Sequence, residues 1–426
     1  MSDLAAVLAP HYTRFGVADR LLLTGHSHQA WPDVALDGLQ EAFADAAGSV
    51  DGKWESAFAK ADQVREGLRR FVGAPGAEVA LGASTHDLIL RVLSALDLGR
   101  RPQIVTSDAE FHTVRRQLDR LGEAGVEVVR VAAEPVSDLA ARIGDRVGDR
   151  TAAVLVSAVL FETALIVPGL GDLAATCRRH GAELIVDAYH AVGVIPFTTE
   201  GLESAWIVGG GYKYLQLGEG NCYLVLPAHA DDLRPVITGW YAEFAELDAT
   251  PAAGRVGYPR GAARYTGATY DPASHYRAAA VLDFFTAQDL SPDLLRKVSQ
   301  HQVGLLADRF DAIDVPPPMI TRDRSRPLDA FAGFLTLRTP FAAQLCAAMQ
   351  DRGVLVDSRG PHLRMGPAPY LSDAQLISAA DHLAAAVAGL GRSGVPADPT
   401  SPPIRRNVAI RSDQPPRRSH HDGYRR

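Results

Sequence analysis

Short apolar runs alternate with amphipathic stretches along most of the chain before residue 210. The apolar runs lie at 103–107, 126–131, 152–160, 182–188 and 204–210. The stretches at 57–71, 113–125 and 169–181 place apolar residues at helical spacing. Strands that are apolar on both faces and alternate with helices are typical of a parallel sheet covered by helices on each side. The pattern therefore predicts an α/β fold with a mostly parallel sheet.

A different pattern begins near residue 270. Long helices are predicted at 274–288 and 292–310, and strand-like runs at 333–338 and 353–357 precede a last helix from about Asp373. This indicates a smaller α+β domain. The chain is thus expected to comprise an N-terminal arm (1–40), a large domain (41–270), a small domain (271–390) and a tail (391–426).

Composition limits the class of protein. Apolar residues make up 47% of the chain and charged residues 22%, as in ordinary globular proteins. No apolar run reaches the roughly 18 residues that span a bilayer, and the first residues lack the pattern of a secretory signal. Three widely spaced cysteines argue against a disulfide framework and a cysteine zinc site. We expect a cytoplasmic protein with no membrane partner.

The tail differs in charge from the rest of the chain. From Gly391 onward eight arginines stand against three aspartates, although the net charge of the whole chain is −7. Polar, Pro-rich sequence without periodicity is typical of disordered segments, so we expect the tail to be dispensable. The remaining body is acidic and gives no reason to expect a nucleic-acid partner.

Polar residues follow several predicted strands or open a helix. In open α/β sheets, ligands bind beyond the carboxyl ends of the strands. We therefore expect a single site formed by Ser84, Thr85, Phe111, His112, Ser157, Asp187, Tyr212 and Lys213.

Lys213 follows three glycines and lies between two tyrosines. A partly buried lysine has a lowered pKa and can act as an amine nucleophile or form a Schiff base. A glycine turn with a surface lysine is the alternative. Tyr214 follows the lysine, so the segment is not a nucleotide P-loop, and no GxGxxG follows the first strand to indicate a dinucleotide site.

Asp187 ends the apolar run at 182–188. A carboxylate there is costly unless it meets a cation, and a protonated pyridine nitrogen would be such a partner. A helix N-cap or a metal ligand shared with His190 are the alternatives. No convincing third ligand accompanies them, so we expect no metal site.

Other candidates bind anions or rings. Ser84 and Thr85 open a helix, whose N-terminus suits a phosphate group, although plain N-capping explains Thr85 equally well. Phe111 or His112 could stack on a planar ring or belong to the core. Arg364 lies in an apolar strand and needs an anion, either a substrate carboxylate or an internal ion pair.

These motifs together resemble the fold-type I pyridoxal 5′-phosphate (PLP) enzymes of the class V aminotransferase group, and within it the kynureninases. The resemblance runs from about Leu21 to Leu390 and rests on six segments: THDL, VSAVLFET, DAYHAVG, GYKYLQLGEG, TGWYAEF and LRMGPAPYLSD.

The resemblance implies a role for each matching residue. Lys213 would carry the Schiff base, and Asp187, His190 and Ser157 would contact the cofactor. Tyr212 and Thr85 would bind its phosphate. Trp240 would reach the phosphate from the partner subunit of a homodimer. Arg364 would bind the α-carboxylate of an amino-acid substrate.

Two segments depart from the kynureninase pattern, and both concern the substrate. Residues 24–28 read Thr-Gly-His-Ser-His instead of Gly-Asn-Ser-Leu-Gly, which makes His28 a candidate substrate contact. Gly267 stands where an asparagine is expected and is grouped with the cofactor-binding residues. The expectation is a kynureninase-like enzyme that hydrolyses the Cβ–Cγ bond of kynurenine or a related amino acid.

Several alternatives stay open. The same residues could support β-elimination, C–S cleavage, transamination or decarboxylation of another L-amino acid. Cysteine desulfuration is disfavoured because Cys346 lies in an apolar helical stretch and is interpreted as a core residue. The alternative that is not an enzyme is a degenerate PLP-binding protein.

Overall fold

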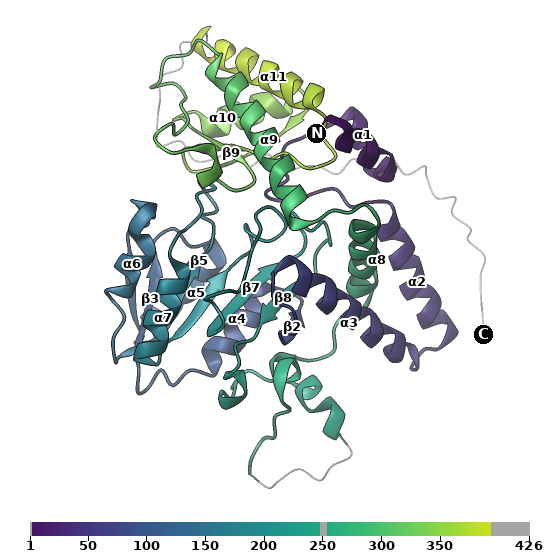
Figure 1. Ribbon diagram of the computed structural model, residues 1–426, viewed down its shortest axis with the longest axis vertical. Helices are drawn as coiled ribbons and strands as arrows, with labels where there is room; N and C mark the ends of the chain where they lie inside the picture. Colours follow the sequence, from purple (N-terminus) through teal and green to yellow (C-terminus); the bar gives the residue numbers. More distant parts are fainter. Residues whose placement is uncertain (1, 248–253, 393–426) are drawn as a thin grey trace, which may run out of the picture. The chain divides into compact units, whose positions relative to one another are not determined.

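The computed structural model describes residues 2–247 and 254–392 (Figure 1). The predicted tail therefore lies outside the described residues, apart from the end of the last helix. No helix of the described part is long and apolar enough to cross a membrane.

A seven-stranded sheet forms the centre of the large domain. Its strands, in spatial order, are β2 (Val79–Gly82), β8 (Cys222–Val225), β7 (Ala205–Gly210), β6 (Glu183–Asp187), β5 (Thr151–Ser157), β3 (Gln103–Ser107) and β4 (Glu127–Val131). Only β8 runs antiparallel to its neighbours. The predicted mostly parallel α/β fold is confirmed.

Helices cover both faces of this sheet. Ile104, Leu155 and Trp206 share one core with α4 (Thr85–Ser94) and α5 (His112–Glu123). The alternate residues Val105, Val154 and Ile207 share the other core with α3 (Lys53–Phe71), α6 (Leu139–Gly144) and α7 (Leu170–His180). Because both faces are buried, the central strands β5, β6 and β7 are largely apolar instead of alternating.

Helix α8 (Ala273–Ala287) lies within the range predicted for the small domain, but it packs against α2 (Val34–Gly48) and α3. Figure 1 shows α2 and α8 side by side. A segment with η6 (Trp240–Glu246) and η7 (Gly261–Tyr265) connects the sheet to α8.

The small domain contains a three-stranded antiparallel sheet. Its strand order is β11 (Asp357–Arg359), β12 (His362–Met365) and β9 (Leu335–Arg338). The helices of this domain are α9 (Pro292–Asp311), α10 (Ala342–Gln350) and α11 (Asp373–Arg392).

The N-terminal arm joins the small domain. After α1 (Ser2–Leu8), strand β1 (Leu21–Leu22) pairs in parallel with β10 (Val354–Leu355). The Gln375 side-chain amide donates to the carbonyls of Val17 (2.8 Å) and Arg20 (2.9 Å). The arm is therefore a structural part of the C-terminal region.

Candidate active site

A cavity of about 240 Å³ lies at the carboxyl edge of the large sheet. Its lining includes eight of the predicted site residues: Ser84, Thr85, Phe111, Ser157, Asp187, His190, Tyr212 and Lys213. Loops from β3, β5, β6 and β7 and the start of α4 supply these residues, so the strand ends converge as the sequence pattern indicated.

The Lys213 amine is buried next to His190. Lys213 Nζ lies 2.6 Å from His190 Nε2 and 4.5 Å from the centre of the Tyr189 ring. Burial lowers the pKa of Lys213 to about 7, although the nearby charge of Asp187 opposes this shift. A large fraction of this lysine is therefore a neutral amine near neutral pH.

His190 is held neutral. Burial and the neighbouring Lys213 charge keep its pKa well below the usual value. A neutral imidazole that accepts from Lys213 at Nε2 carries its own proton on Nδ1. Nδ1 is buried and has no hydrogen-bond partner among the described residues.

Asp187 presents a partly buried carboxylate to the cavity. Its Oδ1 accepts a hydrogen bond from the Tyr189 backbone N–H at 2.8 Å, an Asx-type contact at the end of β6. Burial raises the pKa of Asp187, while the Tyr189 amide and the Lys213 charge oppose this. Within the described ranges it forms no ion pair, so a cationic partner would stabilise it.

The start of α4 forms another wall of the cavity. The Ser84 hydroxyl accepts from the Asp87 N–H at 3.1 Å, so Ser84 is the N-cap residue. Thr85, for which N-capping was the alternative interpretation, is instead the first helical residue and lines the cavity with His86. Free N–H groups and hydroxyls at this helix start suit a phosphate group.

Five predicted residues lie outside this cavity: Trp240, His28, Gly267, His112 and Arg364. Trp240 is 42% exposed, and its indole N–H donates to the Thr269 hydroxyl at 3.2 Å. His28 is exposed and stacks on Tyr212 with ring centres 4.7 Å apart. Gly267 lines an adjacent cavity of about 660 Å³.

His112 does not line the small cavity either. It begins α5, and its ring centre lies 5.5 Å from that of Phe111 and 5.2 Å from that of Phe161. Of the two candidates for stacking on a planar ring, Phe111 is therefore the one with access to the cavity.

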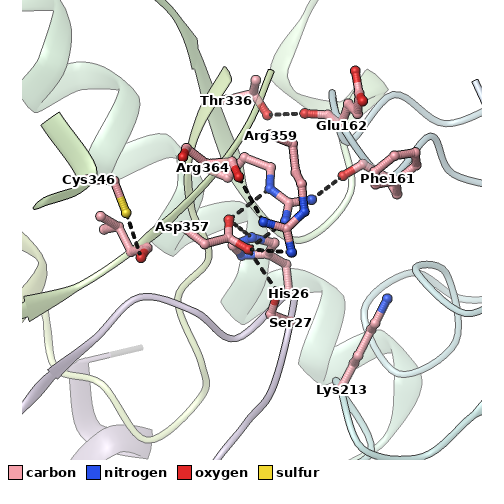
Figure 2. A network of polar contacts seen from close by, with 12 residues as sticks. His26, Ser27, Phe161, Glu162, Lys213, Thr336, Cys346, Asp357, Arg359 and Arg364 are labelled. Atoms are coloured by element: carbon pink, nitrogen blue, oxygen red, sulfur yellow. Dashed lines mark hydrogen bonds and ion pairs between the residues drawn. The ribbon is translucent and has the colours of Figure 1, made fainter. Parts of the chain in front are cut away.

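Arg364 on β12 is 2% exposed and already holds a carboxylate (Figure 2). Its Nε and one Nη donate to the two oxygens of Asp357 at 2.8 and 2.5 Å, and the other Nη donates to the Phe161 carbonyl. His26 and Ser27 also bond to Asp357, at 2.8 and 2.9 Å. The structure thus contains the internal ion pair that was one of the two interpretations of Arg364.

This ion pair leaves part of the guanidinium free to bind. A guanidinium has five N–H donors, and Arg364 uses three of them in these bonds. Burial alone would raise the pKa of Asp357, but the bonds from His26 and Arg364 hold it far below its usual range. A substrate carboxylate would share Arg364 with a permanent internal anion.

Several lining residues carried no separate signal in the sequence. His86, Gln117, Phe161, Glu219 and Cys222 line the cavity, as does Tyr189 within the DAYH motif. Cys222 lies 3.8 Å from the Tyr189 hydroxyl, and burial raises the pKa of its thiol to about 11. Within the described part of the chain, no three His, Cys, Asp or Glu side chains gather as metal ligands.

Comparison with known proteins places this site in a family. The sequence profile of the family described as Aminotransferase class-V matches residues 29–219, the part that holds most of the cavity lining. Over this range the chain is similar to the class-V aminotransferase group.

Relatives of this chain carry different activities. It is 27% identical over 342 residues to isopenicillin N epimerase of Streptomyces clavuligerus, covering 75% of this chain and 83% of the relative. It is 25% identical over 382 residues to kynureninase of Burkholderia pseudomallei (strain 1106a), covering 85% and 88%.

Solved structures share the fold of this chain. A mutant of C-DES with glycine covalently linked to its PLP cofactor superposes with a TM-score of 0.77 at 16% identity, covering 88% of this chain and 98% of that one. The apo cysteine desulfurase of Thermococcus onnurineus NA1 gives 0.74 at 16% identity, covering 90% and 98%.

The cavity fits PLP, the cofactor that the similarity to the class-V aminotransferase family indicates. Lys213 offers a buried amine that can react with the aldehyde of PLP. Asp187 offers a carboxylate to the ring nitrogen, and this carboxylate forms no ion pair within the described residues. His190 Nδ1 is a buried donor that lacks a partner there. The start of α4 offers Thr85 and free N–H groups for the phosphate, and Phe111 an aromatic face.

The low pKa of Lys213 predicts how the apoprotein takes up PLP. Only the neutral amine is nucleophilic, and its fraction falls about tenfold per pH unit below the pKa. We expect the rate of covalent PLP capture to rise about tenfold per unit below pH 7 and to level off above it. Stopped-flow absorbance would measure it. A rate still rising steeply at pH 9 would show that the lysine keeps an ordinary pKa.

Proposed function

We propose that the protein is a kynureninase-like PLP enzyme that hydrolyses the Cβ–Cγ bond of L-kynurenine or a related amino acid. One observation carries the amino-acid chemistry. A buried lysine with a pKa near 7 shares a cavity with a partly buried carboxylate that has no ion pair in the described residues and with a helix N-terminus. The kynureninase relative, which aligns over 85% of this chain, supports the finer assignment.

The residues of the chain have distinct roles in this reaction. PLP, when bound, withdraws electrons from the α-carbon of the amino acid. Lys213 removes the α-proton, since its amine is neutral near pH 7, and His190 lies 2.6 Å away to exchange protons with it. Asp187 holds a proton at the ring nitrogen. The free N–H groups of Arg364 orient the substrate carboxylate.

Hydrolysis then needs one water molecule. Its oxygen adds to the γ-carbonyl carbon, the Cβ–Cγ bond breaks, and Cβ takes up a proton. With kynurenine the products are anthranilate, which keeps the oxygen of the water, and alanine.

Epimerisation at the α-carbon is the second candidate. The isopenicillin N epimerase relative supports it. His26, one of the residues that depart from the kynureninase pattern, is fully buried and bonded to Asp357 instead of lining the cavity. Epimerisation needs the same removal of the α-proton, followed by return of a proton to the opposite face of the α-carbon, but no cleavage of a carbon–carbon bond.

One experiment in deuterated water separates these reactions. The holoenzyme is incubated with L-kynurenine and with 3-hydroxykynurenine, and Lys213→Ala serves as the control. We expect anthranilate or its hydroxylated analogue together with an equal amount of alanine. Recovered substrate that is deuterated and inverted at the α-carbon, without cleavage, would instead establish epimerisation. Formation of a keto acid would establish transamination.

We also propose that the functional unit is a homodimer, in which Trp240 contacts the partner. Trp240, Phe244 and Ile237 are all at least 40% exposed, and Val236 is 82% exposed. The segment is anchored on α3, with Phe58 and Phe244 ring centres 5.3 Å apart. Large apolar side chains gathered on a surface are typical of an interface.

Negative charges introduced at Trp240 and Phe244, in this exposed apolar segment, should separate the subunits. We expect the wild type to scatter light as a dimer and the double variant Trp240→Glu/Phe244→Glu to be monomeric and to retain PLP poorly. Val7→Glu, which alters an exposed apolar residue on α1, is the control and should stay dimeric. A wild type that is monomeric and fully active at assay concentration would contradict the proposal.

A further inference from the structure

Glu110 is a buried carboxyl beside the cofactor cavity that does not line it. It is 3% exposed and follows β3. Its Oε1 accepts from the Ser107 hydroxyl at 2.5 Å, and its Oε2 accepts from the Ser157 hydroxyl at 2.6 Å. The Ser157 backbone N–H also points to Oε1, at 3.3 Å. The carboxyl therefore ties the ends of β3 and β5 together.

These bonds determine whether the Ser157 hydroxyl donates or accepts a hydrogen bond toward the cavity. An ionised carboxyl only accepts hydrogen bonds, and a serine hydroxyl has a single proton to donate. With this proton committed to Glu110, Ser157 has only lone pairs left for a ligand. Ser157 lines the cavity, whereas Ser107 does not. Ser157 is also the register partner of Asp187 on the adjacent strand β6.

We propose that Glu110 is a positioning residue that fixes the Ser157 hydroxyl as a hydrogen-bond acceptor toward the cofactor. The group that donates to Ser157 would be an O–H or N–H of PLP, so the inference rests on the proposed PLP-dependent function. Glu110 acts only through Ser157, because it does not itself reach the cavity.

A purely structural link between the two strands would not need an acid here. A glutamine of the same size could bridge Ser107 and Ser157 without the cost of burying a charge. Burial raises the pKa of Glu110 to about 7, and the two serine hydroxyls oppose this by stabilising the ionised form. The Asp187 charge raises it further. An acid in so unfavourable a place is explained by the hydrogen-bond direction that its ionised form, the major one above about pH 7, imposes.

The experiment compares PLP dissociation constants, titrated by cofactor absorbance on the apoprotein. In Glu110→Gln the amide N–H can donate to Ser157 and turn the serine proton toward the cavity. We expect Glu110→Gln and Ser157→Ala each to weaken binding about two- to tenfold, the value of one hydrogen bond. The double variant should be no weaker than Ser157→Ala alone, because both changes remove the same contact.

The control is Ser107→Ala, which removes the other hydroxyl from Glu110 but leaves the Ser157 bond. Its dissociation constant should stay within about twofold of wild type even if its melting temperature falls. Glu110→Asp and Glu110→Asn form a second size-matched pair for use if Glu110→Gln does not fold. The Glu110→Asp variant should bind PLP more tightly than the Glu110→Asn variant.

Two results would overturn the inference. One is equal PLP affinity of the acid and the amide within a pair, and the other is additive losses in the double variant. A wild-type protein that binds no PLP would instead remove the proposed function, and this inference with it. Normal PLP binding without turnover of kynurenine would reject only the assignment of substrate.

Discussion

Replacement of Lys213 by alanine is expected to abolish turnover and the visible absorption of lysine-bound PLP, although PLP can still bind without a covalent bond. No other amine is available to replace it, because the chain has only four lysines, at positions 53, 60, 213 and 297. Only Lys213 lines the cavity. Activity assays and absorbance spectra of the purified variant would measure the loss.

Lys297→Ala is the matched control, because Lys297 is exposed on α9 and should be replaceable without effect. Borohydride reduction followed by peptide mapping gives an independent readout. A pyridoxyl group found on Lys53, Lys60 or Lys297 would show that the assignment of Lys213 is wrong.

The Asp187→Asn variant should lose about three orders of magnitude in rate, or about 4 kcal/mol of transition-state stabilisation. A neutral amide cannot keep the pyridine nitrogen protonated, so electron withdrawal from the substrate weakens. The fold should persist, because asparagine can still accept the hydrogen bond from the Tyr189 N–H. Steady-state kinetics and circular dichroism would separate these effects.

Asp108→Asn is a suitable comparison. Asp108 follows β3, and its carboxylate accepts from the Ala133 N–H at 2.8 Å, but it does not line the cavity. Its amide variant should keep most of the activity. Near-wild-type rates in Asp187→Asn would remove Asp187 from the proposed role.

Local patterns in the sequence were sufficient for most of the large sheet. The central parallel strands β5, β6 and β7 are largely apolar runs because helices bury them on both faces. The outer strands β3 and β4 mix apolar with polar residues. The two strands that were not predicted, β2 and β8, have four residues each. They are paired antiparallel over a distance of some 140 positions, and such pairing leaves no local periodicity.

The candidate site likewise contains some features that the sequence predicts and others that it does not. Lys213 and Asp187 were predictable because a lysine in a glycine turn and an acid at the end of an apolar strand are both anomalous locally. The partner of Arg364 was not predictable, since it follows from the register of β11 and β12, which sets Asp357 opposite Arg364. The burial of Glu110 was hidden for a similar reason, because Ser157 comes from another strand.

The pairing of β1 with β10 affects the order in which the protein can fold during synthesis. His26 in the arm and Asp357, which holds Arg364, are 331 positions apart. The arm leaves the ribosome first, and its apolar residues Leu22 and Leu23 must wait for almost the whole chain before they are covered. A nascent chain can therefore complete the central sheet and the PLP cavity long before it can assemble the arginine that is expected to hold the substrate.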